Sequence, residues 1–458
     1  MSGKTGRVCI VGGGPAGLSL ARSLKALAIP FDAYERHSDL GGLWDSENPG
    51  TPVYRSAHFI SSKTKSQFHD FPMPAEYPDF PSARQILSYI RAFAKAYDLY
   101  PHFNLGTEVK SAHLVDGAWD VTLATGEIHR YAALICATGT NWHPSLPQYP
   151  GTFTGEMRHS ASYDGMEEFA GKRVLVIGGG NSGCDIACDA AQAADSAFIS
   201  LRRGYHFIPK RIFGMPADVF GSSGPQLPMR LEQAIFGVML RLLTGDLTKL
   251  GLPKPDHRLF ESHPILNDQL LHHLAHGNIK AKPDVERFDG RAVLFKDGTR
   301  EEIDLVLCAT GYDWKIPYVD PGLFQWSGTR PNLFLNIFNR ETPSLYALGF
   351  IETNGGLYGL LDETADIVAR AILARGAGGR EAQALDRLVA ASSGDLSGGI
   401  NFIKSARHQN YVDIHAYQKA LKRLRRRLGW PDLTLDRFTS LRAAPRQKHA
   451  KLRAPEER

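Results

Sequence analysis

At 458 residues the chain is longer than one hydrophobic core usually serves, so its length favours two domains of ordinary size. With 43% hydrophobic and 22% charged residues, the composition excludes a fibrous or disordered chain and is typical of a globular enzyme. The net charge of +5 is modest, and much of the positive excess follows residue 418, in Lys419, Lys422, Arg423, Arg425, Arg426 and Arg427.

The cysteines and the apolar segments bear on the compartment in which the protein works. Five cysteines, an odd number, are spread over the 458 positions without a metal-type cluster, which favours a reducing compartment, so we expect a cytoplasmic protein without disulfides. Residues 1–6 are polar and do not resemble a signal peptide. The most apolar helical stretch, 229–243, contains Arg230, Glu232 and Arg241 and is too short to span a bilayer, so we expect membrane contact to be peripheral at most.

The first predicted unit is an apolar strand (residues 7–11), a glycine-rich turn and a helix (residues 16–28). This first glycine turn has the sequence Gly12-Gly13-Gly14-Pro15-Ala16-Gly17. In such a motif Gly12 permits the tight turn, Gly14 lets the backbone approach a pyrophosphate, and Gly17 lets the helix pack on the strand. Unpaired N–H groups at the start of the helix would then face the phosphates.

Glu35 ends the next predicted strand, residues 31–34, and indicates which nucleotide the first glycine turn prefers. A carboxylate at this place suits a pair of ribose hydroxyls and repels a 2′-phosphate, so the site is predicted to take FAD or NAD rather than NADP. We expect the following turn to pass close to the bound cofactor, because its glycines allow close approach; its sequence is Leu40-Gly41-Gly42-Leu43-Trp44.

Residues 45–84 are rich in proline, serine and aromatic residues and have little periodicity. We expect them to form a long irregular loop, and such loops in compact domains usually serve a site. A helix is predicted over residues 83–97, because apolar residues recur on one face at Ile86, Leu87, Ile90, Phe93 and Ala94.

A weak internal repeat indicates how the domains are arranged. Residues 116–140 and 289–312 each have the pattern of a hairpin, an apolar strand and Ala-Thr-Gly. Both halves are therefore predicted to share one dinucleotide-binding plan, with the second half inserted into the first. The expected domains are 1–164 with 312–440, and the inserted 165–311, which itself contains a helical insertion at about 213–276; residues 441–458 are expected to be a disordered tail.

The second glycine turn follows an apolar strand, residues 173–177, and has the sequence Gly178-Gly179-Gly180-Asn181-Ser182-Gly183. Its next strand ends with Arg202 and Arg203, followed by Lys210 and Arg211, and no acid stands at the ribose position. Guanidinium groups grip a 2′-phosphate through forked hydrogen bonds, so this site is predicted to take NADPH. Two such turns with opposite charge at the ribose indicate a two-nucleotide flavoenzyme.

Three other sequence features were weighed against this interpretation. Cys184 and Cys188 share a helix face, but the chain has no Cys-x-x-Cys, which disfavours a disulfide reductase and leaves oxygen as the expected electron acceptor. No acid or cysteine accompanies the insertion's histidines at metal spacing, so no metal is predicted; they are His257, His263, His272, His273 and His276. Residues 417–428 are predicted to form an amphipathic helix with Leu421, Leu424 and Leu428 inside and a basic outer face, which favours a solvated helix over nucleic-acid binding.

The linker between the two turns carries the most specific motif. Phe153, Gly155, His159 and Tyr163 match the Phe-x-Gly-x-x-x-His-x-x-x-Tyr fingerprint of class B flavin-dependent monooxygenases. The chain resembles the flavin-containing monooxygenase family from about residue 7 to residue 375, also in Glu35-Arg36, Gly41-Gly42-Leu43-Trp44, Phe68-His69-Asp70-Phe71-Pro72, Gly180-Asn181-Ser182-Gly183-Cys184-Asp185 and Ala309-Thr310-Gly311-Tyr312. Baeyer-Villiger enzymes are less similar, because Tyr163 and Asp164 stand in place of Trp-Pro.

The resemblance implies an α/β fold of two Rossmann-like domains, the NADP domain inserted into the FAD domain. In this family NADPH reduces FAD, O₂ adds at the flavin C4a position, and the resulting (hydro)peroxyflavin oxygenates a nitrogen or sulfur atom of a small or medium nucleophilic substrate. The implied FAD residues are Gly12, Gly14, Pro15, Ala16, Gly17, Glu35, Gly42, Leu43 and Trp44. The implied NADP residues are Gly180, Asn181, Ser182, Gly183, Cys184, Arg202, Arg203, Thr310 and Gly311. His159 is expected to be a hydrogen-bonding residue at the domain junction.

One position departs from the family. Where an Asn normally donates a hydrogen bond near the flavin, this chain has Ile60, which cannot donate. Ser61, Ser62 and Lys63 follow directly and are the candidate replacements; alternatively Ile60 is a core residue of a divergent loop.

The rival functions are an NADPH oxidase that produces H₂O₂, or a Baeyer-Villiger-type monooxygenase on the same scaffold. A more distant rival is a non-catalytic nucleotide-sensing protein that works through its basic C-terminal helix. Substrate identity and oligomeric state stay open at this stage.

Overall fold

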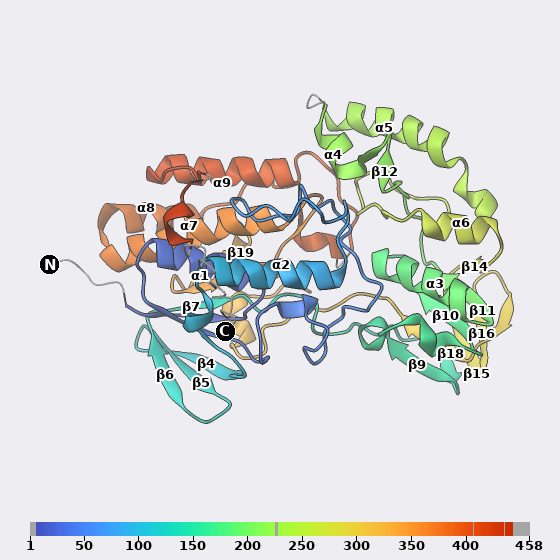
Figure 1. Cartoon of the computed structure of the whole chain (residues 1–458), viewed down its shortest axis with the longest axis horizontal. Helices are drawn as coiled ribbons and strands as arrows, with labels where there is room; N and C mark the ends of the chain where they lie inside the picture. Colours follow the sequence, from blue (N-terminus) through green and yellow to red (C-terminus); the bar gives the residue numbers. More distant parts are fainter. Residues whose placement is uncertain (1–5, 225–227, 406, 435, 443–458) are drawn as a thin grey trace, which may run out of the picture.

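The computed structural model describes residues 6–224, 228–405, 407–434 and 436–442 (Figure 1). One mostly parallel and one fully parallel sheet, each with its helices, lie side by side along the long axis of the molecule, the first domain at the left of Figure 1 and the second at the right. This arrangement confirms the predicted α/β fold of two Rossmann-like domains.

The first domain is built on a seven-stranded sheet in the order β19-β20-β21-β7-β1-β2-β3. Its parallel strands are β1 (Val8–Val11), β2 (Phe31–Tyr34), β3 (Phe103–Asn104), β7 (Ala133–Cys136) and β21 (Leu345–Ala347), and β20 (Phe338–Asn339) and β19 (Leu333–Phe334) extend it antiparallel. The helices α1 (Pro15–Ala26), α2 (Ala83–Ala96) and α7 (Tyr358–Ala377) pack in the same core. Because β21 pairs with β7, the chain returns to this sheet after leaving it.

The second domain is built on a five-stranded parallel sheet in the order β14-β11-β10-β18-β9. Its strands are β9 (Glu156–His159), β10 (Arg173–Ile177), β11 (Ser196–Ser200), β14 (Ile279–Lys282) and β18 (Leu305–Cys308). Helices α3 (Asn181–Ala193) and α6 (Gln269–Ala275) pack on it. The edge strand β9 comes from the fingerprint segment, so the linker is itself part of this sheet.

The sequence repeat corresponds to two similar antiparallel sheets. One contains β4 (Val109–Val115), β5 (Ala118–Leu123) and β6 (Ile128–Tyr131) and leads into β7. The other contains β15 (Val285–Gly290), β16 (Ala292–Phe295) and β17 (Arg300–Glu302), with β8 (Gly151–Phe153) along β15, and leads into β18. Each sheet therefore precedes the strand that lies beside β1 or β10.

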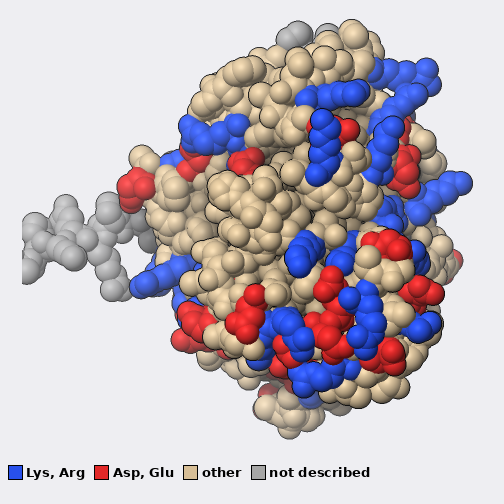
Figure 2. Space-filling view, turned by 90° about the vertical axis from the view of Figure 1, so that its right-hand side faces the viewer, with Lys and Arg blue, Asp and Glu red and all other residues tan. Residues whose placement is uncertain are grey.

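The insertion folds around a small core of its own, formed by Ile208, Ile212, Ala217, Leu240 and Leu259. It contains β12 (Arg211–Ile212), β13 (Met215–Pro216), α4 (Ala217–Ser222), α5 (Met229–Thr244) and α6. Within the described ranges, every helix is too short or too polar to cross a lipid bilayer. Figure 2 shows acidic and basic side chains interspersed over the lower part of the molecule's right-hand end.

The C-terminal helices α8 (Gly379–Ala390) and α9 (Ile414–Leu428) cover the first domain. Leu421 and Leu424 are buried, as the periodicity predicts, but Arg425 is not on the outer face. Its side chain is turned inward and pairs with Asp366 of α7 at 2.6 Å, which corrects its assignment to the basic outer face. Most of the predicted disordered tail, 441–458, lies outside the described residues.

Candidate active site between the two nucleotide turns

The two glycine turns have the same backbone geometry. A Cβ atom at Gly17 would lie 1.9 Å from the carbonyl oxygen of Gly12, and one at Gly183 would lie 2.0 Å from that of Gly178. Gly12 and Gly178 adopt φ angles of +115° and +117°, a region that disfavours side chains. The repeat in sequence is thus a repeat in three dimensions.

Helices α1 and α3 begin at these turns with glycine caps, Gly14 and Gly180. A glycine cap has no side chain to accept from the first N–H groups, in contrast to α2, where Ser82 and Gln85 form a capping box. The open N–H groups and the close backbone approach fit a pyrophosphate at each turn. The residues present therefore fit FAD at the first turn and a nicotinamide dinucleotide at the second.

Glu35 lies at the end of β2 directly beside the first turn. Its Oε2 accepts from the Gly13 N–H at 2.6 Å and its Oε1 from the His37 N–H at 2.8 Å, and only 5% of the residue is exposed. Gly42, Leu43 and Trp44 form a short 3-10 turn next to it, and a Cβ atom at Gly42 would lie 2.9 Å from the Gly14 Cα. The predicted FAD residues of the first turn and of the Gly42–Trp44 segment are therefore neighbours, and the buried Glu35 carboxylate lies beside them.

The second turn carries positive charge instead. Arg202 is exposed and Arg203 half-buried, and neither forms an ion pair or side-chain hydrogen bond with another described residue. Arg211 pairs with Asp79, and the Lys210 Nζ lies 5.4 Å from the centre of the Phe80 ring. Of the guanidinium groups that follow β11, those of Arg202 and Arg203 are thus the ones left for a ligand, and among the described residues the Lys210 ammonium has only its contact with the Phe80 ring.

The fingerprint residues fix the linker on the second domain. The His159 Nδ1 accepts from the Ala161 N–H at 3.1 Å, so its Nε2 carries the proton and donates to the Gly311 carbonyl at 3.0 Å. Burial lowers the pKa of His159 below 6.5, which keeps the ring neutral. The Tyr163 hydroxyl donates to Asp189 of α3 at 2.8 Å, and a Cβ atom at Gly155 would lie 2.6 Å from the Phe153 ring. Thr310, beside Gly311, donates to the Ser145 carbonyl at 2.5 Å.

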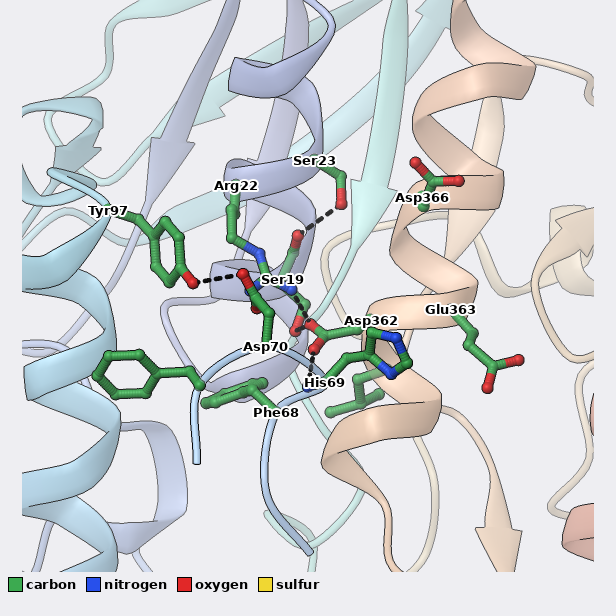
Figure 3. A network of polar contacts seen from close by, with 12 residues as sticks. Ser19, Arg22, Ser23, Phe68, His69, Asp70, Tyr97, Asp362, Glu363 and Asp366 are labelled. Atoms are coloured by element: carbon green, nitrogen blue, oxygen red, sulfur yellow. Dashed lines mark hydrogen bonds and ion pairs between the residues drawn. The ribbon is translucent and has the colours of Figure 1, made fainter. Parts of the chain in front are cut away.

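A buried charge network that the sequence did not reveal fixes the first domain around its turn. Figure 3 shows Arg22 of α1 between Asp70 of the long loop and Asp362 of α7. The Arg22 Nη2 and Asp362 Oδ1 are 2.6 Å apart, the His69 N–H donates to Asp362 at 2.7 Å, and the Tyr97 hydroxyl donates to Asp70 at 2.6 Å. The Phe68–Pro72 motif therefore anchors the loop to the helix that begins at the first turn.

The turn at Ile60 is exposed, and the polar groups after it already have partners. Ile60 is 38% exposed, so it is not a core residue. The Ser61 hydroxyl bonds to that of Ser66, and Ser62 donates to Asp218 of the insertion. The Lys63 ammonium donates to three backbone carbonyls, those of Pro74, Ala75 and Tyr77.

The cysteines take no part in this arrangement. Each of the five described cysteines is a buried free thiol, and Cys184 and Cys188 of α3 face the second core as expected. Burial raises the pKa of both thiols, so neither is a thiolate near neutral pH. Cys184 therefore contributes packing beside the second turn.

Comparison with known proteins places this geometry in context. The family model described as flavin-binding monooxygenase-like matches residues 5–377. Human flavin-containing monooxygenase 5 is 35% identical over 383 residues, which covers 77% of this chain and 70% of that protein.

Solved structures share the fold at lower identity. S-allyl-L-cysteine S-oxygenase from Allium sativum has a TM-score of 0.67 and 19% identity, over 95% of this chain and 91% of that chain. NADP⁺-bound cyclohexanone monooxygenase from Rhodococcus sp. Phi1 has a TM-score of 0.63 and 16% identity, over 80% and 84% of the two chains.

Proposed function

This chain belongs to the flavin-binding monooxygenase-like family, and from that premise we propose that it oxygenates a nitrogen or sulfur atom of a small or medium organic molecule. As a member it is an FAD- and NADPH-dependent monooxygenase that consumes O₂. The substrate class is the proposed part. Its main support is the fingerprint, with Tyr163 and Asp164 where the Baeyer-Villiger pattern has Trp-Pro, together with the 35% identity to a flavin-containing monooxygenase.

In this proposal the two turns divide the binding work by charge. The first turn binds the FAD pyrophosphate through the N–H groups at the start of α1, and Glu35 accepts from ribose hydroxyls. The second turn binds NADPH, with Arg202 and Arg203 on the 2′-phosphate. When bound, FAD supplies the two-electron transfer from NADPH and the reaction with O₂.

The protein's own contribution is positioning and exclusion of water. His159 holds the linker to Gly311 while neutral, and Tyr163 holds it to α3, so both contacts fix the linker on the domain of the second turn. The reaction requires no protein nucleophile. Consistent with this, burial raises the pKa values of the Cys184 and Cys188 thiols, so they stay protonated and unreactive. Substrate and O₂ would meet between the domains.

A second candidate function is an NADPH oxidase that releases H₂O₂, and the observation that favours it is Ile60. An aliphatic side chain at this turn donates no hydrogen bond, and the Lys63 ammonium beside it is bonded to carbonyls. Without a donor to stabilise the charge that develops when oxygen reacts, oxygen is more readily released as H₂O₂ than transferred to a substrate.

The test separates these functions by product. Purified protein reconstituted with FAD is mixed with NADPH without oxygen, and loss of the yellow absorbance reports flavin reduction. In air, O₂ uptake, H₂O₂ yield and product are then measured with a tertiary amine, a thioether and a cyclic ketone. Oxide formed from the amine or thioether supports the proposal. Stoichiometric H₂O₂ with every substrate favours the oxidase, ester formed only from the ketone favours the Baeyer-Villiger reaction, and the absence of flavin reduction contradicts all three.

A further inference from the structure

The long loop of the first domain is bonded to the second domain at two separate places. At one, the Tyr54 hydroxyl donates to Asp185 of α3 at 3.1 Å, and Ser56 donates to Asp189 at 2.5 Å. At the other, Ser62 donates to Asp218 of the insertion. The loop therefore spans both domains, and its second attachment lies at the turn that carries Ile60.

Asp218 accepts hydrogen bonds from both donors of Ser62, its N–H and its hydroxyl. One carboxylate oxygen, Oδ2, accepts from the Ser62 N–H at 2.7 Å and from the Ser62 hydroxyl at 2.9 Å. The other, Oδ1, accepts from the Val219 N–H at 2.8 Å within α4. Ser62 is 1% exposed, so its N–H is shielded from water and depends on this carboxylate, whereas its hydroxyl is also within 3.1 Å of the Thr64 hydroxyl.

The turn that carries Ile60 also contacts the first domain, at the Trp44 segment and at the backbone before α7. The ring of Phe59, which precedes Ile60, lies 4.9 Å from the Trp44 ring in the segment beside Gly14. On the other side, a Cβ atom at Gly356 would lie 1.8 Å from the Lys65 carbonyl oxygen, so the backbone before α7 is in direct contact with the loop. The turn is thus fixed by the first domain at both ends and by the insertion at Ser62.

We propose that Asp218 is a positioning residue: by binding Ser62 it fixes the turn that carries Ile60, so that this turn keeps its shape only while the insertion is docked on the loop. The charged Arg211–Asp79 pair, between β12 of the insertion and the loop, supports the same docking. This inference rests on the proposed function, because its consequence for oxygen use requires a flavin next to the turn.

The structural arm of the test measures amide hydrogen exchange in the FAD-loaded protein. Asp218→Ala removes both acceptors, and we expect the Ser62 amide to exchange at least about tenfold faster, as the loss of a buried hydrogen bond to a charged group predicts. Asp246→Ala is the matched control, because Asp246 also accepts from an N–H and a hydroxyl, those of Thr248, but inside the insertion. Ser62→Ala, which keeps the N–H bond to Asp218, serves if Asp218→Ala does not fold, with an expected smaller increase at residues 61–63.

The functional arm measures the fraction of oxidised NADPH that appears as H₂O₂. We expect Asp218→Ala to raise this fraction, Asp218→Asn to raise it less because an amide oxygen still accepts, and Asp246→Ala to leave it unchanged. Unchanged exchange at Ser62 in Asp218→Ala overturns the inference, and so does faster exchange with an unchanged peroxide fraction. A wild-type protein that does not oxidise NADPH contradicts the proposed function instead, while the exchange result still decides whether Asp218 orders the turn.

Discussion

The two glycine turns have the same backbone and opposite surroundings. Around the first, Glu35 is buried and bonded to Gly13, and the Arg22 network ties α1 to α7 and the long loop. Around the second, the charged groups that would meet a ligand are the guanidinium groups of Arg202 and Arg203. Neither forms an ion pair or a side-chain hydrogen bond with another described residue. One turn is already ordered by the protein, whereas the other keeps its charges available.

This difference matches what two kinds of nucleotide require. A prosthetic group that stays bound is served by a site whose groups are ordered beforehand, since little conformational entropy is then lost on binding. A co-substrate that must bind and leave is served by exposed charges that attract it and release it. In the proposed function, both turns therefore bind a dinucleotide through the same backbone geometry, and the side chains around each turn set how firmly that dinucleotide is held.

The largest expected effect, on flavin binding and flavin reduction, comes from replacing the last glycine of each turn by alanine. Gly17→Ala places a Cβ atom 1.9 Å from the Gly12 oxygen, and Gly183→Ala places one 2.0 Å from the Gly178 oxygen, so both turns must distort. We expect Gly17→Ala protein to lose its yellow colour. Gly183→Ala protein should stay yellow but have its flavin reduced by NADPH at least about a hundredfold more slowly, since a backbone overlap of this size costs several kcal/mol.

Absorbance spectra and anaerobic reduction traces measure both outcomes. Gly221→Ala, where an added Cβ atom meets nothing within 4 Å, is the control. If Gly183→Ala lost FAD and Gly17→Ala kept it, the assignment of the two turns would be reversed.

A smaller effect is expected at the second turn's charges. Arg202→Ala should raise the Kd for NADPH by about tenfold to a hundredfold, because hydrogen bonds to charged groups contribute about 1.5–3 kcal/mol. The Kd for NADH, which lacks the 2′-phosphate, should change by less than about twofold on the same reasoning. Arg211→Ala is the control, since Arg211 is bonded to Asp79. Equal weakening of both nucleotides in a binding titration would exclude Arg202 as the 2′-phosphate ligand.

At the first turn, Glu35→Gln should weaken FAD by about tenfold, because the amide oxygen still accepts from Gly13 but a charged hydrogen bond becomes neutral. Titration of apoprotein with FAD, followed by flavin fluorescence, measures this change. NADPH affinity should be unaffected. A variant that binds FAD as tightly as the wild type would show that the carboxylate serves the fold of the turn and not the ribose.

The smallest expected effect concerns the linker between the turns. Burial lowers the pKa of His159 below 6.5, so the unfolded chain binds more protons than the folded one as the pH falls below that value. His159 therefore lowers the free energy of unfolding as the pH falls from about 7 to about 5, by at most about 1.4 kcal/mol per unit of pKa shift. His159→Gln should flatten this dependence in denaturant titrations. His113→Gln, on β4, is the control, and an unchanged slope in His159→Gln would contradict a neutral buried imidazole.

Sequence patterns were sufficient to predict both glycine turns, the return of the chain to the first domain and the long irregular loop. Each of these features depends on residues close together in the chain. The Arg22–Asp362 contact was not foreseen, since it joins residues far apart in sequence and nothing local marks a charged residue in α1 as buried. Arg425 differs from its predicted position for the same reason: helical periodicity predicts an outer face for it, whereas Asp366 on another helix turns the arginine inward. Asp218 and Ser62 likewise become neighbours only when the insertion is folded.

The strand order of the first sheet has a consequence for biosynthesis. β21 lies beside β7 and carries β20 and β19, so this sheet is complete only after residue 347 has left the ribosome, whereas the sheet formed by β9 to β18 is encoded without interruption before that point. The domain encoded second can therefore be completed first during translation, while β7, already beside β1, still lacks β21 on its other edge. Nascent chains arrested after β18 but before β21 has left the ribosome should already protect the second domain from protease and leave the amino-terminal segment open to cleavage.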